Sequence, residues 1–318
     1  MPVLYLTEDD VRSLLTMDLA LEAVEAAFRK LSLDEAENIP RHRCQTDGAV
    51  LHVLPAAAKT LGGLGLKAYT TSKAGAQFHV FLYDPKLGGL TAIIAADYLG
   101  QMRTGAASGV ATKRLARKDA ASLGLYGTGK QARTQLLAIA KVRSLKKVHV
   151  YSREAAKRLA FAAEMSPLCG IEVIPVETPE EAAHGFDIIC TATASREPVL
   201  FGSWIAEGSH LNIVGSNFLA KTEIDAEVVR RASRVVVDSK EQAKCEAGDF
   251  VAALRNGSLC WGDVTELAHI VTGRYPGRES PQDITLFKSL GLGIEDVAVG
   301  VRVLDLARKN GVGIELPF

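Results

Sequence analysis

Apolar residues near the start of the chain recur with the spacing of helices. Thr7 precedes an apolar series that starts at Val11, and Asp10 stands three residues after Thr7, as in a capping box. Thr16 precedes a second series with helical spacing, formed by Ala20, Val24, Phe28 and Leu31. The pattern therefore predicts two successive helices at the start of the chain.

The hydrophobic pattern shortens between residues 41 and 94. Short apolar runs are separated there by Gly, Pro and Lys, which is typical of strands. The predicted strands are Val50–Leu54, Leu64–Tyr69 and His79–Tyr83, and the segment DPKLGG at 84–89 predicts a turn after the third. This part of the chain is therefore predicted as helices packed on a mostly antiparallel sheet, an α+β arrangement.

Beyond Leu115 the pattern alternates between strands and helices. The predicted strands are Ala121–Tyr126, Lys147–Tyr151, Ile171–Val176, Phe186–Cys190, Leu211–Val214 and Val235–Val237. Helices are predicted at Gln131–Val142, at Arg153–Met165 and after Thr178, where Pro179 occupies the first helical position. Such alternation predicts a parallel sheet with helices on both faces, an α/β fold of the Rossmann-type, doubly wound class.

A final helix is predicted at Ile294–Lys309. Val297, Val301 and Leu304 give it an apolar face, and Gly311 follows as a stop signal. This helix can return to the first part of the chain.

Composition limits the classes of protein that the chain can form. It has 318 residues, of which 47% are hydrophobic and 23% are charged, so disordered and collagen-like chains are excluded. The length suggests two domains or one large one. The 37 Lys and Arg balance the 37 Asp and Glu. No global positive field is available for a nucleic acid or an anionic membrane, and we expect neither as a partner.

Cysteine usage and the first residues bear on the compartment. The five cysteines are widely spread without a CxxC pair, which predicts no metal site, no disulfide framework and reduced thiols, buried at Cys169 and Cys190. The first residues, MPVLYLTEDD, lack the basic segment followed by an apolar segment that is typical of a signal peptide. No apolar stretch is long enough to span a bilayer. We therefore expect a cytoplasmic protein.

A glycine-rich loop carries the first sign of function. Residues 127–132 read Gly-Thr-Gly-Lys-Gln-Ala, a G-x-G-x-x-A element between a predicted strand and a predicted helix. Gly127 permits the tight turn, Gly129 lets the backbone approach a pyrophosphate, and the helix N-terminus attracts the phosphates. The alternative is a tight turn that binds no ligand. The context favours a dinucleotide site.

The next strand ends in Ser152-Arg153 rather than in an acid. An acid at this place would hold the ribose hydroxyls of NAD and repel a 2′-phosphate. Arg153, with Lys157 and Arg158 one turn later, offers guanidinium and ammonium donors that suit a phosphate. The sequence thus favours NADP, with NAD possible, although Ser-Arg is also an ordinary solvated helix start.

Several motifs together resemble the ornithine cyclodeaminase/mu-crystallin family. Residues 101–108 read QMRTGAAS and precede GTGKQA by about twenty positions. Pro40-Arg41 stands ahead of VLPA at 53–56, Gly65-Leu66-Lys67 follows, and the later motifs are VGSN at 214–217 and TLFKSLG at 285–291. The resemblance covers essentially the whole chain.

The resemblance implies an architecture and a chemistry. It implies a substrate-binding and dimerisation domain built from both chain ends, residues 1–115 with 296–318, and a Rossmann NADP-binding domain at 116–295. Members act on 2-amino or 2-imino acids with a nicotinamide cofactor, and they are usually dimers. We therefore expect a homodimeric oxidoreductase with a small imino or amino acid as its substrate.

The resemblance also implies site residues. Arg41, Lys67 and Arg103 match the cations that hold the substrate carboxylate, a role that suits guanidinium groups because they bind carboxylates bidentately. Arg43 competes with Arg41 for the first of these places. The positions matched to the cofactor are Thr104, Gly127, Gly129, Lys130, Gln131, Ser152, Arg153, Arg158, Thr193, Val214, Gly215, Lys221 and Ser289.

Position 217 departs from the deaminating members of the family. Asn217 stands where those enzymes have an Asp near the substrate amine, and an amide cannot act as a general base. Reduction of an imine needs no such base, so Asn217 indicates a ketimine reductase in which Lys67 or a water supplies any proton. Asn217 could instead bind substrate or cofactor, or cap a helix near Thr222. Asp296 is either a first-turn helix acid or a pocket residue.

Three functions follow as hypotheses. The first is NAD(P)H-dependent reduction of cyclic 2-imino acids, such as Δ1-pyrroline-2-carboxylate and Δ1-piperideine-2-carboxylate, with Lys67 and Asn217 as the catalytic candidates. The second is an ornithine cyclodeaminase or L-alanine dehydrogenase. The third, from another class, is a non-catalytic NADP-binding protein of the crystallin type.

Overall fold

The computed structural model describes residues 2–317, and its contacts divide the chain into two compact units. Unit 1 comprises the residues up to Ala107 together with those from Gly291 onward, and unit 2 comprises Ser108–Leu290. The sequence instead suggested boundaries after residues 115 and 295. Helix α3 (Asp97–Leu115) runs without interruption through the first boundary, so no loop marks it in the sequence.

Unit 1 is built on a mostly antiparallel sheet. The strand order is β16-β1-β7-β6-β5-β4-β2 with β3 also paired to β4, and only β1 and β7 run parallel. The strands are β1 (Val3–Leu6), β2 (Ala36–Asn38), β3 (His42–Gln45), β4 (Ala49–Ala58), β5 (Gly63–Ser72), β6 (Gly75–Tyr83), β7 (Leu90–Ala95) and β16 (Ile314–Leu316). The predicted α+β arrangement is confirmed.

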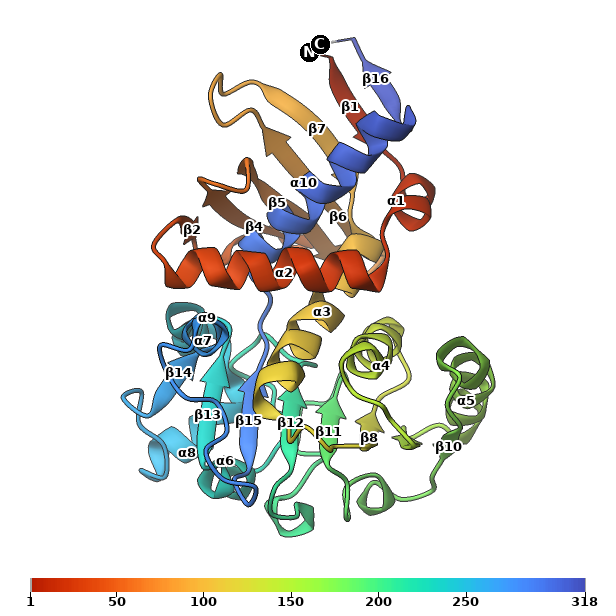
Figure 1. The fold of residues 1–318 in the computed structure, drawn as a ribbon, viewed down its shortest axis with the longest axis vertical. Helices are drawn as coiled ribbons and strands as arrows, with labels where there is room; N and C mark the ends of the chain where they lie inside the picture. The colour runs from red at the N-terminus through yellow and green to blue at the C-terminus, as the bar shows by residue number, and fades with distance from the viewer. Residues whose placement is uncertain (1, 318) are drawn as a thin grey trace. The chain divides into compact units, whose positions relative to one another are not determined.

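Three helices complete unit 1 besides the first part of α3. Thr7 caps α1 (Glu8–Leu14) in a full capping box with Asp10, and Thr16 caps α2 (Met17–Ser32), so both predicted helix starts are confirmed. The last helix, α10 (Gly293–Asn310), packs on β4, β5 and β6 and on α2 (Figure 1). The end of the chain thereby supplies the cover of a sheet made from its beginning.

Unit 2 contains an eight-stranded sheet in which every pairing is parallel. The order is β10-β9-β8-β11-β12-β15-β13-β14. The strands are β8 (Ser122–Tyr126), β9 (Lys147–Tyr151), β10 (Val173–Pro175), β11 (Ile188–Thr191), β12 (His210–Ile213), β13 (Arg234–Val237), β14 (Val264–Glu266) and β15 (Thr285–Lys288). The order reverses between β8 and β11, which is where open α/β sheets bind their ligands.

The helices of unit 2 give the sheet two buried faces. They are α4 (Lys130–Val142), α5 (Ala155–Cys169), α6 (Ala226–Arg231), α7 (Lys240–Glu246), α8 (Val251–Arg255), α9 (Leu267–Thr272) and the 3-10 turns η1 (Glu180–Ala182), η2 (Gly202–Trp204) and η3 (Gly248–Phe250). Leu125 and Cys190 belong to one core cluster, and Tyr126 and Ile189 to the other, as expected for strands covered on both sides. The predicted Rossmann-type class is confirmed.

The helix predicted after Thr178 is wrong. The N-terminal signals are present, but the chain forms only the single 3-10 turn η1 there. Gly185 adopts a positive φ of 73° soon afterwards and leads directly into β11. The space between β10 and β11 is thus bridged by one turn.

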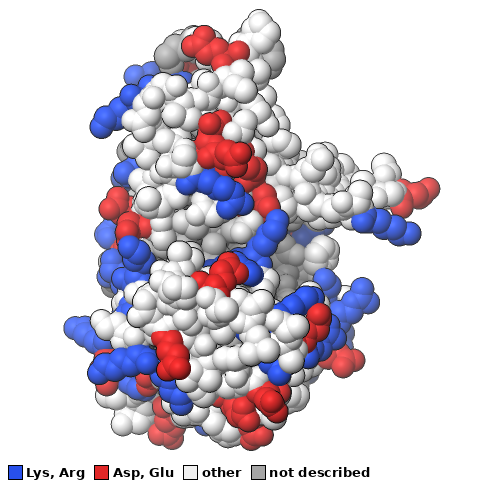
Figure 2. Space-filling model, turned by 90° about the vertical axis from the view of Figure 1, so that its right-hand side faces the viewer, with Lys and Arg blue, Asp and Glu red and all other residues white. Residues whose placement is uncertain are grey.

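Charge and hydropathy of the folded chain agree with its composition. Lys and Arg are interspersed with Asp and Glu over the face shown in Figure 2, without a large area of one sign. Of the helices between residues 2 and 317, none combines the length and the apolar character that crossing a bilayer requires.

Candidate functional site

The three cations matched to the substrate carboxylate all lie in unit 1 and are all buried. Arg41 is in the loop before β3, Lys67 is in β5 and Arg103 is in α3, with exposed fractions of 9%, 3% and 6%. Lys67 lies in the row of β-sheet residues that faces α10, between Leu54 and Val80 on the neighbouring strands. Three separate elements therefore carry these cations into the interior of unit 1.

Two carboxylates at the start of α10 hold Lys67 and Arg103. One oxygen of Asp296 accepts hydrogen bonds from Lys67 Nζ at 2.8 Å and from Arg103 Nε at 3.1 Å. Glu295 accepts from Arg103 Nη1 at 2.8 Å. Both acids are fully buried. Asp296 therefore lies in the first turn of α10 and also pairs with two buried cations from other elements.

Gly291 joins Arg41 to this cluster. Its carbonyl oxygen accepts from Arg41 Nη2 at 3.1 Å, and its φ is +79°. A Cβ on residue 291 would stand 2.3 Å from Arg103 Nη1, so the guanidinium requires a glycine there. The chain places this glycine where it passes from β15 to α10.

Burial strongly affects the protonation of Lys67. It lowers the pKa of Lys67 to about 8, against the Asp296 carboxylate, which raises it, and with Arg103 and Arg41, which lower it further. Burial also opposes the charge of Arg103, but Asp296 and Glu295 outweigh this effect and raise its pKa. Lys67 is thus a cation that can release its proton near neutral pH, whereas Arg103 is a permanent one.

Arg43, the competitor of Arg41, has a different environment. It is exposed on β3, and its Nε donates to His52 Nδ1 at 3.2 Å. The His52 ring stacks on Tyr69 at 4.2 Å between centroids. The geometry therefore groups Arg41, and not Arg43, with the buried cations.

In unit 2 the glycine-rich loop connects β8 to α4. Gly127 has φ +106°, and a Cβ there would lie 2.4 Å from the Ala192 carbonyl oxygen. Gly129 is the N-cap of α4, where no side chain caps the helix and a Cβ would meet nothing within 4 Å. The start of α4 thus has no side-chain cap and leaves space beside Gly129, which suits a pyrophosphate at the helix N-terminus.

Two of the other cofactor candidates carry buried oxygens without a partner. The side-chain oxygens Gln131 Oε1 and Ser289 Oγ accept or donate no hydrogen bond among residues 2–317. Gln131 lies in the first turn of α4, and Ser289 directly follows β15. Unpaired buried polar atoms fit positions that a polar ligand would complete.

Of the cofactor candidates after β9, Arg158 and Ser152 form hydrogen bonds within the chain, and Arg153 is exposed. Arg158 donates to the backbone oxygen of Ser152, and its guanidinium lies 5.7 Å from the Tyr151 ring. The Ser152 hydroxyl accepts from Thr128 at 3.4 Å, which ties it to the glycine-rich loop. Arg153 is exposed. A phosphate at the end of β9 would meet Arg153 and the backbone ordered by Arg158.

Glu223 is a buried acid that the sequence did not reveal. It accepts from the backbone N–H and the hydroxyl of Thr193, both at 2.7 Å, and from the Gly215 N–H at 2.6 Å. It therefore braces the carboxyl ends of β11 and β12, next to the reversal point of the sheet. The Thr193 hydroxyl, a cofactor candidate, is used in this brace. Glu223 lies in a loop and belongs to no motif, so the sequence alone did not indicate its role.

The other candidates are placed as follows. Thr104 donates its hydroxyl proton to the Gly100 oxygen at 2.7 Å within α3, and Lys130 begins α4. Val214 follows β12 directly, and the Lys221 ammonium lies 5.4 Å from the Phe218 ring.

Asn217 lies half-buried in the loop after β12. No helix begins near Thr222 within the described chain. Helix α6 starts at Ala226, and Asp225 caps it. The interpretation of Asn217 as a cap of that helix is therefore wrong.

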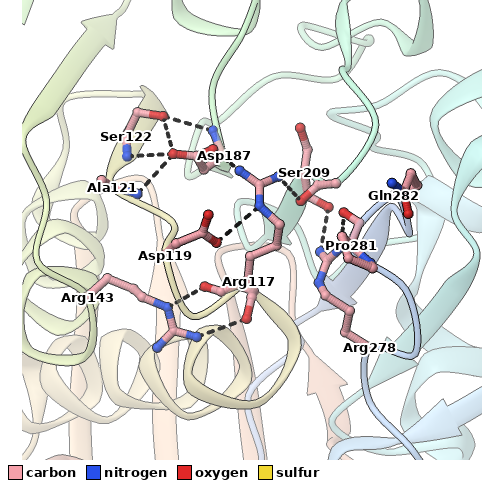
Figure 3. Close-up of polar contacts among 12 residues, drawn as sticks. Arg117, Asp119, Ala121, Ser122, Arg143, Asp187, Ser209, Arg278, Pro281 and Gln282 are labelled. Atoms are coloured by element: carbon pink, nitrogen blue, oxygen red, sulfur yellow. Dashed lines mark hydrogen bonds and ion pairs between the residues drawn. The ribbon is translucent and has the colours of Figure 1, made fainter.

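A second group of cations lies at the amino ends of the parallel strands, beside a cavity of about 740 Å³. Figure 3 shows that Arg117 pairs with Asp187 and that Arg278 donates to the Ser209 oxygen. Arg143 donates to the Arg117 oxygen at 3.0 Å and to the Thr112 oxygen at 2.8 Å. These arginines therefore hold backbone and side-chain oxygens of the chain itself.

The sequence model of the ornithine cyclodeaminase/mu-crystallin family matches residues 3–311. The chain belongs to this family. Its relatives include a Δ1-pyrroline-2-carboxylate reductase of Bacillus cereus, which is 33% identical over 329 residues that cover 99% of this chain and 100% of that protein. The resemblance inferred from the motifs is confirmed.

Two solved structures share the fold over the full length. Thermococcus litoralis Δ1-pyrroline-2-carboxylate reductase in complex with NADH and L-proline has 37% identity and a TM-score of 0.94, over 99% of this chain and 100% of that one. An archaeal alanine dehydrogenase dimer with bound NAD has 34% identity and a TM-score of 0.94, over 100% of both chains.

Proposed function

We propose that the protein reduces cyclic 2-imino acids, Δ1-pyrroline-2-carboxylate and Δ1-piperideine-2-carboxylate, to proline and pipecolate with NADPH. Its class follows from the family and the relatives: it is a nicotinamide-dependent oxidoreductase acting on C=N and CH–NH bonds. Unit 1 would bind the substrate, and unit 2 would bind the dinucleotide.

The charge count of the buried cluster supports this substrate class. Arg41, Lys67 and Arg103 carry three positive charges, and Glu295 and Asp296 carry two negative charges. Three cationic side chains gathered in one buried cluster suit a substrate that carries a carboxylate.

The chain's residues can perform the remaining steps of a reduction. When bound, the nicotinamide supplies a hydride to C2 of the imino acid. Arg41 and Arg103 would hold the substrate carboxylate and so fix the C=N bond in position. Lys67, with its pKa near 8, would give a proton to the substrate nitrogen and recover it from water. Asn217 cannot accept a proton, which disfavours deamination.

The preference for NADPH over NADH is part of the proposal. Arg153 is exposed directly after β9, and Ser152 replaces the acid that would repel a 2′-phosphate. A guanidinium at this place can pair with that phosphate, and an NADH ribose offers it no charge.

A homodimer that acts in the cytoplasm completes the proposal. The sheet face of unit 1 opposite α10 carries a cross-strand row of half-buried apolar residues, Pro55, Leu66, Phe81 and Ile93. Leu51 and Leu64 extend this face with exposed fractions of 37% and 36%. An apolar sheet face of this kind suits a second copy of the chain. His79 lies on the same face, away from Lys67.

A turnover assay tests the activity. Oxidation of NADPH and of NADH is followed with Δ1-pyrroline-2-carboxylate, Δ1-piperideine-2-carboxylate, iminosuccinate and pyruvate plus ammonium, and NAD⁺ reduction is followed with ornithine and alanine. We expect turnover of the two cyclic imines, faster with NADPH. Ammonia release from ornithine or alanine as the main reaction would contradict the proposal. Binding of NADPH without any turnover would indicate the non-catalytic alternative.

A further inference from the structure

We infer that Asp296 is a positioning residue for catalysis, which uses one carboxylate oxygen to hold the Lys67 ammonium, the proton donor, beside the Arg103 guanidinium. The inference rests on the proposed function, since it concerns the proton that imine reduction requires. Asp296 would act through Lys67 and Arg103 and not through contact with the substrate.

The geometry of the carboxylate carries the inference. Asp296 Oδ1 lies 2.8 Å from Lys67 Nζ and 3.1 Å from Arg103 Nε, so a single atom fixes the separation of the two cations. Asp296 is fully buried, and its other oxygen accepts no hydrogen bond from any residue between 2 and 317. The side-chain hydrogen bonds of Asp296 therefore go to these two cations.

Asp296 is the carboxylate that pairs with the Lys67 ammonium. The rings of Phe78 and Tyr69 lie 5.3 Å and 5.9 Å from Nζ, and the neighbouring strands contribute apolar side chains. Helix α3 contributes Arg103, and the loop before β3 contributes Arg41, both of which repel an ammonium. Glu295, the residue before Asp296 in α10, pairs with Arg103 Nη1 at 2.8 Å.

Removal of the Asp296 charge would therefore change the protonation of Lys67. Burial, Arg103 and Arg41 all lower the pKa of Lys67, and Asp296 opposes them. Without Asp296 only the lowering influences remain, and Lys67 would be a neutral amine at physiological pH. A neutral amine cannot give a proton to the substrate nitrogen.

Gly100 shows that the place of the ammonium is also defined sterically. A Cβ on residue 100 of α3 would stand 2.8 Å from Lys67 Nζ and 4.0 Å from Asp296 Oδ1. The helix thus leaves just enough room for the pair. An alanine at position 100 would displace the ammonium without changing any charge.

This arrangement would serve the reduction of the C=N bond. A bound dihydronicotinamide would supply the hydride and be oxidised to the nicotinamide, so that its own C–H bond breaks as the C–H bond at C2 forms, and the π electrons of the C=N bond move to nitrogen. The nitrogen takes a proton from the Lys67 ammonium, and Lys67 is left as a neutral amine beside Asp296. Water then returns a proton to Lys67, so that the ion pair is restored for the next turnover.

The test compares Asp296→Asn with Glu295→Gln. Each substitution removes one negative charge from an acid that pairs with Arg103, but only Asp296→Asn deprives Lys67 of its partner. For Asp296→Asn we expect kcat to fall by about a hundredfold, and the alkaline limb of kcat/KM to move about one to three pH units lower. For Glu295→Gln we expect a higher KM, with the limb in its wild-type place.

Two results would overturn the inference. One is an Asp296→Asn limb that stays in its wild-type place, and the other is an equal displacement by Glu295→Gln. Should Asp296→Asn fail to fold, Gly100→Ala takes its place, with a lower kcat and a limb displaced in the same direction expected. An unchanged kcat and limb in Gly100→Ala would likewise overturn it.

A binding measurement separates this inference from the proposed function. Pyrrole-2-carboxylate is a planar monocarboxylate that cannot be reduced in this way, and calorimetry follows its affinity against pH. If no imine is turned over but Asp296→Asn moves the pH dependence of this affinity, the activity is wrong and the positioning role stands. If the wild-type protein binds the probe at no pH, the site itself and the inference fall together.

Discussion

Two groups of partly or fully buried cations in the described chain have different kinds of partner. In unit 1, Lys67 and Arg103 share the carboxylates of Asp296 and Glu295. In unit 2, Arg143 and Arg278 direct their donors mainly at backbone oxygens, for example those of Thr112, Ala116 and Leu115. Burial of a cation by itself therefore does not identify a ligand site.

The kind of partner explains the difference. Arg143 donates to the oxygen of Thr112 in the last turn of α3, where helix carbonyls lack partners of their own, and to the oxygen of Ala116 directly after the helix. Such an arginine completes the fold. The cluster in unit 1 instead gathers three cations around two acidic side chains, so its charged groups are held by other side chains as well as by the backbone.

The largest effect is expected from Arg103→Met. It removes a guanidinium that would grip the substrate carboxylate, and it leaves Glu295 and Asp296 buried with less compensation. We expect kcat/KM to fall by about a thousandfold, together with a lower stability to urea because the buried pairs are broken. Steady-state kinetics and urea unfolding measure both. A kcat/KM within tenfold of wild type would contradict the assignment of the site.

The matched substitution in the other group is Arg143→Met. Because its donors complete backbone carbonyls, we expect a loss of about 2–3 kcal/mol in the free energy of unfolding. KM and kcat should stay within about twofold of wild type. Urea unfolding and the same kinetics decide the matter. A raised KM without loss of stability would show that the two groups do not differ as described.

The pH dependence of activity should follow Lys67. With the pKa of Lys67 at about 8, we expect kcat/KM to fall about tenfold per pH unit above that value. Lys67→Arg keeps a cation that does not titrate in this range, so its profile should be flat there at a lower rate. If kcat/KM of the Lys67→Arg variant still falls above pH 8, the titrating group is not Lys67.

Stability should respond to the same group with the opposite sign. The pKa of Lys67 is lower in the folded chain, about 8, than its ordinary value of 10.5. Between these values the unfolded chain binds the proton that the folded chain has lost, so this group's contribution to stability rises with pH. A loss of activity above pH 8 therefore cannot be explained by destabilisation of the fold through the titration of Lys67.

The smallest expected effect concerns the cofactor. In Arg153→Ala we expect Kd for NADPH to rise about tenfold or less, because the pair is solvent-exposed, while Kd for NADH stays constant. Lys157→Ala is the control, since it removes an equal charge from the same segment but from a side chain paired with Glu154 at 2.6 Å. Equal losses in both variants would indicate general attraction and not recognition of the 2′-phosphate.

The sequence was informative where local chemistry decides the structure. Thr7 and Thr16 mark helix starts because their hydroxyls satisfy backbone donors within three residues. The loop at Gly127 was equally legible, since the glycine is required by a positive φ and a close carbonyl. These signals depend on neighbours in the chain.

Features that depend on contacts between distant parts of the chain could not be predicted from local sequence. Helix α3 was not predicted, because it is rich in small residues and buried around most of its surface, so it shows no apolar stripe. β15 inserts between β12 and β13, and no local pattern announced it. The role of Asp296 was undecided because its partners, Lys67 and Arg103, lie about two hundred positions earlier.

The return of α10 to unit 1 has a consequence for synthesis on the ribosome. Strands β4, β5 and β6 emerge early, but the helix that packs on them and the acids that pair with Lys67 and Arg103 are made last. Unit 2 is contiguous and can fold while translation continues. The amino-terminal segment therefore cannot complete its core or its buried ion pairs until α10 has been synthesised.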